Sequence, residues 1–401
     1  MAKFEALLEI NPKNVQSLAE YIAYCKYYFK PKSEDKIKNY SDFYSLKNDF
    51  PFIRQDIRKN STYKSNETLK DFPLNWLKNE IIGKEKKYVE FDNKDIQIIQ
   101  KISGIYEESQ LNNLQEYVNK LPKYSFAIWF KFQLEAPYFS KDDDEFYIIQ
   151  NPILKETNFK VPMVRGSGWK GALASAFREL FREDFQNNKE KIESFLRVFG
   201  AGSESIKTIE SYVFGKSGDL NKAKDSLLKF MLFELGLKID SNLIKEVKGK
   251  NNKEELFQIL RDKLSAKTSD SKLPSEFQTH KGRAIFYPTY FDRLSLEIIN
   301  PHDRRKRAGT NPIHYEVVPK GTEGIFQLIY IPFDGVLKPD EELKAEAEKD
   351  LNNLSVAVAI LSKQGIGAKI KLGWGKFKIE NKKVFLNEEL DIPEEWKKCQ
   401  D

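Results

Sequence analysis

The sequence predicts an α+β protein, in which helical segments are added before and inside a sheet-forming domain. Three observations lead to this class. Every second residue of 126–134 is a large apolar one, and Trp129, Lys131 and Gln133 fall on the other face, which indicates a strand. Apolar residues then recur at helical spacing across 172–181. Strand-like composition returns after residue 282 and is followed by a second helical pattern and a last strand.

From residue 124 onward the predicted order is strand, helix, several strands, helix, strand. This order is the outline of a ferredoxin-like unit. The 401 residues are enough for two domains or for one domain with a large insertion. We expect a helical N-terminal region at 1–120 and a ferredoxin-like domain at 121–401, interrupted by a charged helical insertion at about 203–275.

The N-terminal region is predicted to be helical and polar, and to act as a docking element. Apolar residues have helical spacing in 17–29 and again in 112–121. Between them, 38–73 is rich in Asn, Ser, Lys and aromatic residues, which indicates loops.

The strand at 126–134 should bury one wholly apolar face, made of Phe126, Ile128, Phe130, Phe132 and Leu134. An acidic loop, SKDDDEFY, follows it. The later strands are expected at 282–291, 294–300, 314–321 and 324–333, before a helix at 340–363 and a glycine turn that enters the final strand.

Composition excludes several classes of site. Cys25 and Cys399 are the only cysteines, so neither a disulfide framework nor a cysteine zinc site can form, and we expect a cytoplasmic protein. The sequence starts without a signal-peptide core and contains no run of 18 apolar residues, so no membrane segment is predicted. The net charge of +6 is too small by itself to indicate nucleic-acid binding.

A basic, glycine-rich segment at 161–175 raises the main functional question. Gly166, Gly168 and Gly171 form a G-x-G-x-x-G pattern that follows a short apolar run and opens a helix. A dinucleotide site would need an uninterrupted apolar strand before the loop and an acid on a second strand about 20 residues later. Pro162 interrupts the first strand, and 183–195 has a polar, helical pattern. A nucleotide-binding oxidoreductase therefore stays a distant alternative.

The same segment suits the phosphate of a nucleic acid. Glycines let a backbone approach closely, N–H groups at a helix N-terminus point at an anion, and Arg165 and Lys170 supply positive charge. The plainer interpretation is a glycine-rich helix start whose two cations are only solvated.

Two further basic loops favour the nucleic-acid interpretation. Lysines, among them Lys369 and Lys371, surround the four glycines of the turn after residue 363, which are Gly365, Gly367, Gly373 and Gly375. A third loop carries His302, Arg304, Arg305, Lys306 and Arg307. One such run is usually a solvated loop, but three on one small sheet domain indicate a surface for RNA.

These segments resemble the RAMP superfamily, the repeat-associated RNA-binding subunits of CRISPR effector complexes. VPMVRGSGWKGALASAFREL resembles the family's segment that opens the first helix, and GIGAKIKLGWGKFKI resembles its C-terminal glycine-rich loop. The central strands with the Asn-Pro-His turn at 300–302 also match, so the resemblance runs in order from about 124 to 380. It is nearest to the backbone-type subunits of type III complexes, particularly the terminal one of the Cmr branch.

The resemblance implies a modified ferredoxin-like (RRM) fold that binds guide RNA through phosphate contacts. It implies as partners the target RNA and other RAMP-family and small subunits of a type III complex. The residues it would place on RNA are Arg165, Gly166, Ser167, Gly168, Lys170, Gly171, Gly365, Gly367, Lys369, Lys371, Gly373 and Gly375, with His302, Arg304, Arg305 and Arg307 as a third contact.

The resemblance also bears on catalysis. In the cleaving members, an aspartate shortly before the second strand's proline helps to cut target RNA. Gln150 and Asn151 precede Pro152 here, and neutral amides cannot replace a carboxylate as metal ligand or base. We therefore expect a non-cleaving subunit without a cofactor. The alternative is a cleaving subunit in which Mg²⁺ is held by the upstream acidic loop, with Asp142, Asp143 and Asp144.

Overall fold

The computed structural model describes the chain from residue 87 to residue 397, with gaps. The described ranges are 87–142, 151–182, 189–202, 207–209, 219–235, 239–252, 254–256, 258–259, 280–303, 308–309, 312–335 and 338–397. The expected helix at 17–29 and the expected loops at 38–73 lie outside these ranges.

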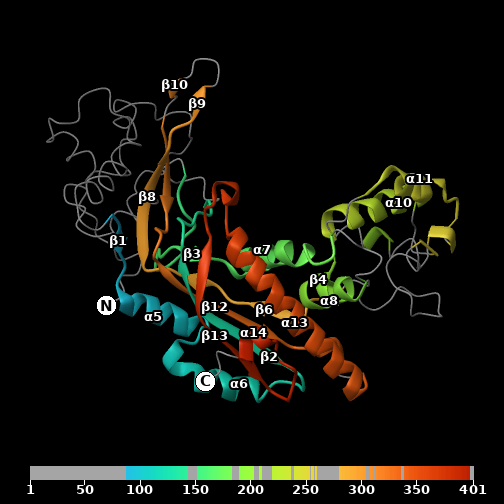
Figure 1. Ribbon diagram of the computed structural model, residues 1–401, viewed down its shortest axis with the longest axis horizontal. Helices are drawn as coiled ribbons and strands as arrows, with labels where there is room; N and C mark the ends of the chain where they lie inside the picture. Colours follow the sequence, from blue (N-terminus) through green and yellow to red (C-terminus); the bar gives the residue numbers. More distant parts are fainter. Residues whose placement is uncertain are drawn as a thin grey trace, which may run out of the picture.

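A four-stranded antiparallel sheet forms the centre of the molecule (Figure 1). Its strands are β2 (Phe126–Leu134), β6 (Ala284–Phe286), β12 (Glu323–Tyr330) and β13 (Phe377–Leu386), in the order β13-β2-β12-β6. β2 pairs along its whole length with both neighbours, Phe130 lying opposite Phe326 on one side and Lys382 on the other. Sheet and helices together confirm the α+β class.

Two long helices cover one face of this sheet. α7 (Gly166–Arg178) follows β2 in the chain, and α13 (Asp340–Gln364) connects β12 to β13. The apolar face of β2 packs beneath them: Phe130 stacks on Phe326 with ring centroids 4.5 Å apart, and Trp169 of α7 meets Phe326 edge-on at 4.8 Å. α14 (Glu394–Lys397) closes this core with the buried Trp396.

The opposite face of the sheet is also covered. α5 (Asn93–Ile102), the 3₁₀ turn η4 (Glu108–Gln110) and α6 (Leu111–Val118) lie across it. Leu114 and Val118 of α6 are fully buried against Trp129 and Ile329 of the sheet. The part of the N-terminal region that follows residue 93 is therefore a second layer on the same domain.

A second, smaller sheet stands on the edge of the domain. β8 (Arg293–Ile299) pairs with β1 (Val89–Glu90) and β11 (Ile313–Val317), and its hairpin continues into β9 (His302–Asp303) and β10 (Ala308–Gly309). A buried ion pair between Lys155 and Glu316 fastens the hairpin to the chain before α7. β3 (Met163–Val164) pairs with β7 (Thr289–Tyr290) beside it.

The remaining helices form a lobe at one side (Figure 1). The chain passes through α8 (Lys189–Phe199) and leaves the core at β4 (Gly200–Ala201), and it returns at β5 (His280–Lys281), which pairs with β4. Between them lie α10 (Leu220–Lys229), the π-helical turn η5 (Phe230–Glu234) and α11 (Ser241–Gly249), all within the predicted insertion. Two short 3₁₀ turns, η7 (Phe333–Gly335) and η8 (Ile370–Leu372), complete the described elements.

No helix within the described ranges has both the length and the apolar character that a membrane crossing needs.

A buried ionic cluster connects α8, where the helical lobe begins, to the core. Arg197 of α8 donates two hydrogen bonds to Asp350 of α13, at 2.7 and 3.1 Å. The Tyr330 hydroxyl donates a further one to Asp350, at 2.7 Å. Arg283, which precedes β6, donates to Tyr330 and to Asp334. The Arg197 and Asp350 side chains are only 5% and 0% exposed, so neither has water as a substitute partner.

We predict that Asp350→Ala lowers the free energy of unfolding by about 3–5 kcal/mol, because it leaves the Arg197 guanidinium buried without its carboxylate. Chemical denaturation followed by circular dichroism measures this loss. As the control, Lys349→Ala breaks an exposed ion pair with Glu190 (3.1 Å) and should cost less than about 1 kcal/mol. Equal losses in the two variants would contradict the role given to the cluster.

Candidate nucleic-acid interface

The N-terminal end of α7 presents backbone N–H groups that have no partner within the helix, and two glycines with space beside them in the described chain. Arg165 is the N-cap, in extended conformation, and its side chain caps no backbone group. The first N–H groups of a helix have no partner within the helix, so those of the Gly166–Gly168 turn can point at a ligand. Ser167 and Gly168 are exposed there.

The three glycines of this pattern differ in what they touch. A Cβ on Gly166 would collide with the carbonyl oxygen of Phe286, so the packing of the chain requires glycine at that position. A Cβ on Gly168 would meet only Val164, at 3.5 Å, and one on Gly171 would meet nothing within 4 Å. Glycine inside a helix costs roughly 0.5–1 kcal/mol relative to alanine. No contact within the described chain explains that cost at Gly168 or Gly171.

The loop after α13 needs its glycines for a different reason. Gly365, Gly367, Gly373 and Gly375 all have positive φ, between 73° and 95°. At Gly367 a Cβ would strike the carbonyl oxygen of Phe139, and at Gly375 it would strike that of Ile366. These glycines therefore let the loop pack tightly against its own backbone and against that of Phe139. The loop is fixed by hydrogen bonds, among them Ala368 N–H to Phe139 (2.7 Å).

Tyr138 joins the two loops. Its hydroxyl donates to the carbonyl of Met163, just before α7, at 3.2 Å. The edge of its ring faces Gly367, where an added Cβ would lie 2.7 Å from it. Burial raises the pKa of Tyr138, and the nearby charge of Arg165 acts in the opposite direction. The segment that opens α7 and the loop that follows α13 therefore meet at the same edge of the domain (Figure 1).

Lysines border this edge. Desolvation and then the positive charge of Lys281 lower the pKa of Lys170, and a nearby anion would raise it again. Lys369 lies over the ring of Tyr315, with its Nζ 5.3 Å from the centroid, and Lys371 is exposed. Sequence reasoning missed Lys281, because no motif links β5 to α7 along the chain.

Trp374, on the same loop, packs edge-on against Tyr315 at 5.7 Å and against Phe139 at 6.4 Å. It is half-buried, so it braces the loop against the β8–β11 hairpin.

The third basic loop lies elsewhere. β9, which begins at His302, is at the far tip of the hairpin, away from α7 (Figure 1). Arg304, Arg305 and Arg307 fall outside the described residues. The structure thus brings together two of the three predicted basic loops.

The acidic loop is described only at its start. Asp142 is buried, and its N–H donates to the carbonyl of Pro152 at 3.1 Å, while Asp143 and Asp144 lie outside the described ranges. Asn151 donates its side-chain N–H to the carbonyl of His314. In the part of the chain that the structure describes, no three His, Cys, Asp or Glu side chains are grouped to hold a metal ion.

The topology around the glycine segment does not fit a dinucleotide-binding loop. A dinucleotide loop connects parallel strands. β3, which precedes the glycine loop here, has two residues and pairs antiparallel with β7, and every strand pairing in the described ranges is antiparallel.

Comparison with known proteins agrees with the sequence resemblance. The RAMP superfamily model matches residues 131–378, and the chain belongs to this superfamily. Among solved structures, a chain of the type III-B Cmr-beta complex bound to cognate target RNA is similar at 12% identity and a TM-score of 0.38, covering 86% of this chain and 85% of that one. Cmr6 from Pyrococcus furiosus is similar at 18% identity and a TM-score of 0.26, covering 64% of this chain and 99% of that one. No curated protein matches the sequence.

We predict opposite stability effects for two glycine substitutions. Gly171→Ala should raise the free energy of unfolding by about 0.5–1 kcal/mol, because the added methyl has open space and alanine favours the helix. Gly375→Ala should lower it by about 1–3 kcal/mol, because its φ of +73° is strained for alanine and the Cβ meets the Ile366 carbonyl. Urea denaturation compares the two. A Gly171→Ala variant as unstable as Gly375→Ala would show that packing explains both glycines.

Proposed function

We propose that this protein is a structural, guide-RNA-binding subunit of a type III CRISPR ribonucleoprotein, and that it binds the RNA backbone at the edge formed by the α7 N-terminus and the loop after α13. The observation that carries the proposal is the open, glycine-bearing surface of α7 at Gly168 and Gly171, next to Lys170. Membership of the RAMP superfamily supports it.

The core is proposed to be a modified ferredoxin-like unit. Its chain order is strand, helix, two strands, helix, strand, through β2, α7, β6, β12, α13 and β13, and the sheet order is β13-β2-β12-β6. RRM domains of this kind stack bases on the open face of the sheet. Here α6 buries that face over Trp129, so the loops at the sheet edge are the surface left for RNA.

Binding at this edge would work through the RNA backbone. The N–H groups at the start of α7 would donate to phosphate oxygens, since the helix dipole favours an anion there. Gly168 and Gly171 would let the strand approach without a side chain in its way. Lys170, Lys281 and Lys369 would neutralise phosphates, and the guide would be read by base pairing with target RNA.

The partners proposed for such a subunit are guide RNA, target RNA and the other RAMP-family and small subunits of the complex, in the cytoplasm. Neither a cofactor nor a metal ion has a part in backbone binding of this kind.

We predict that Lys170→Ala together with Lys369→Ala weakens binding of single-stranded RNA on the order of tenfold at low salt. Each lysine that neutralises a phosphate releases counterions, so the slope of log affinity against log salt should fall by about 1.4 for the pair. Fluorescence anisotropy with a labelled oligoribonucleotide at several salt concentrations measures both quantities.

The matched control is Lys344→Ala with Lys349→Ala, which removes the same charge from α13 at least about 20 Å along the helix from its C-terminal loop. This control should keep the wild-type salt slope. If both double variants lose affinity equally, only net charge matters and the proposed site is wrong.

Gly171→Ala separates this binding from stability. The variant should fold at least as well as wild type and still bind RNA more weakly, because its methyl group occupies the path of the backbone. Unchanged affinity in a folded Gly171→Ala protein would show that RNA does not use the open space at Gly171, and would contradict the proposal.

We predict that alanine at Asp142, Asp143 and Asp144 leaves target-RNA cleavage unchanged in a reconstituted complex, because a backbone-binding subunit needs no carboxylate at the scissile phosphate. Cleavage products resolved on a denaturing gel measure this. Loss of one set of products, with guide RNA still bound, would instead establish the metal-dependent cleaving alternative.

A further inference from the structure

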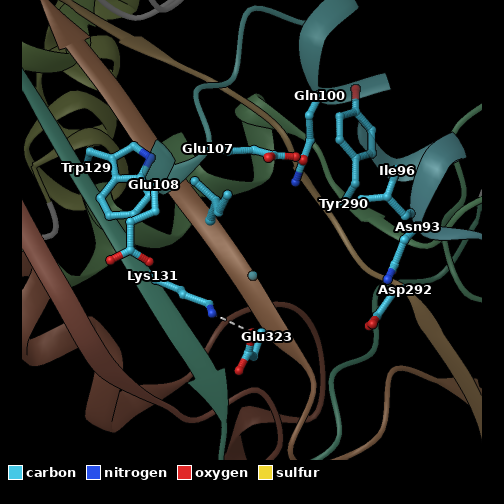
Figure 2. Close-up of a pocket in the computed structure, with 12 residues that line it drawn as sticks. Asn93, Ile96, Gln100, Glu107, Glu108, Trp129, Lys131, Tyr290, Asp292 and Glu323 are labelled. Carbon is cyan, nitrogen blue, oxygen red and sulfur yellow. Dashed lines mark ion pairs between the residues drawn. The ribbon is translucent and has the colours of Figure 1, made fainter. Parts of the chain in front are cut away.

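A pocket of about 240 Å³, drawn in Figure 2, lies on the face of the sheet that α5 and α6 cover. It is a gap in that cover, bounded by α5, by η4 and by the strands β2 and β12. The Lys131–Glu323 ion pair lies on one side and Asn93 with Asp292 on the other (Figure 2). The pocket is smaller than the usual site for a small molecule, of roughly 300–1,000 Å³, and suits one long side chain.

The walls are acidic. Four carboxylates line the pocket, Glu107, Glu108, Asp292 and Glu323, with Lys131 as the cation among the lining residues. Lys131 lies 2.7 Å from Glu323, and this hydrogen bond, assisted by Glu108, raises the pKa of Lys131. The pocket thus already favours the charged form of Lys131. The single positive charge of this lysine does not balance the negative charges of four carboxylates.

Two polar side chains of the wall, Gln100 and Asp292, are open to a ligand in the pocket. Gln100 of α5 is 8% exposed, and among the described residues its side-chain amide has no hydrogen-bond partner. The amide points into the pocket, toward Glu107 (Figure 2). Burial raises the pKa of Asp292, whose closest cation, Arg293 Nε, is 3.8 Å away. The Gln100 amide and the Asp292 carboxylate can therefore accept hydrogen bonds from a ligand in the pocket.

We propose that this pocket receives the side chain of an arginine from a protein partner. A guanidinium carries a fixed charge and five donors in a planar fork, so it can donate to the Gln100 oxygen and to carboxylates on different walls at once. Its aliphatic stem would lie along the half-buried Ile325. The phosphates of an RNA would be repelled by the same carboxylates, so this face is distinct from the basic edge.

The test is an NMR titration of the full chain, with labelled isoleucine methyl groups, by Nα-acetyl-L-arginine methylamide. The methyl signals of Ile96 and Ile325, which line the pocket, should shift. The citrulline analogue, which has the same shape without the charge, should shift neither, and the lysine analogue should bind more weakly because it lacks the fork.

Two variants assign the contacts. Gln100→Met removes the unpartnered amide and should weaken arginine binding about fivefold or more without loss of stability, because the amide has no role within the fold. Asp292→Asn should weaken it by a similar factor through loss of charge. Glu388→Gln, at an exposed carboxylate outside the pocket, is the control and should bind as wild type.

Three outcomes would overturn the proposal: no shift of these methyl groups by the arginine analogue, equal shifts by the citrulline analogue, or shifts produced by single-stranded RNA in its place. The inference does not depend on the proposed RNA site, since Lys170→Ala with Lys369→Ala should leave the titration unchanged.

Discussion

The architecture depends on the two-sided burial of β2. This strand pairs with β12 and β13 over its full length, and its alternate side chains serve two different cores. Phe126, Ile128 and Phe130 pack beneath α7 and α13, whereas Ala127 and Trp129 pack beneath α6. A shift of one residue in register would exchange the two sets and expose both cores, so the pairing is strongly specified. Both surfaces discussed above are positioned by this strand.

The two proposed binding surfaces of the domain have opposite charge because they are formed by different elements around β2. The helix N-terminus of α7 and the loop after α13 meet at Tyr138, beyond the end of β2, and carry lysines. The pocket on the other face collects carboxylates from η4 and β12 around Lys131. This separation fits a subunit that holds RNA along one edge and a protein neighbour on the opposite face.

Much of the core could be predicted from the sequence because its signals are local. The alternation at 126–134 and the helical spacing at 172–181 each identify an element within one window of residues. The apolar face predicted for β2 is the one that packs under α7. Trp129 lies on the face that looked polar, and its burial could not be predicted because it depends on α6 packing from elsewhere in the chain.

Less of the candidate site than of the core could be predicted from the sequence. A glycine pattern does not reveal whether the missing side chain leaves room for a ligand or for the protein itself. Gly171 and Gly375 belong to similar basic motifs, yet one faces open space and the other touches the Ile366 carbonyl. The electrostatic effect of Lys281 on Lys170 and the place of Gln100 in the pocket wall both join distant segments, so neither leaves a local signal in the sequence.

We propose that RNA runs along the edge where the α7 N-terminus and the loop after α13 meet. Photo-crosslinking of thiouridine-labelled RNA to the protein, followed by mass spectrometry of the crosslinked peptides, tests it most directly. We expect crosslinks within 165–171 and within 367–374. Crosslinks confined to α5, α6 or the exposed side of β13 would contradict it.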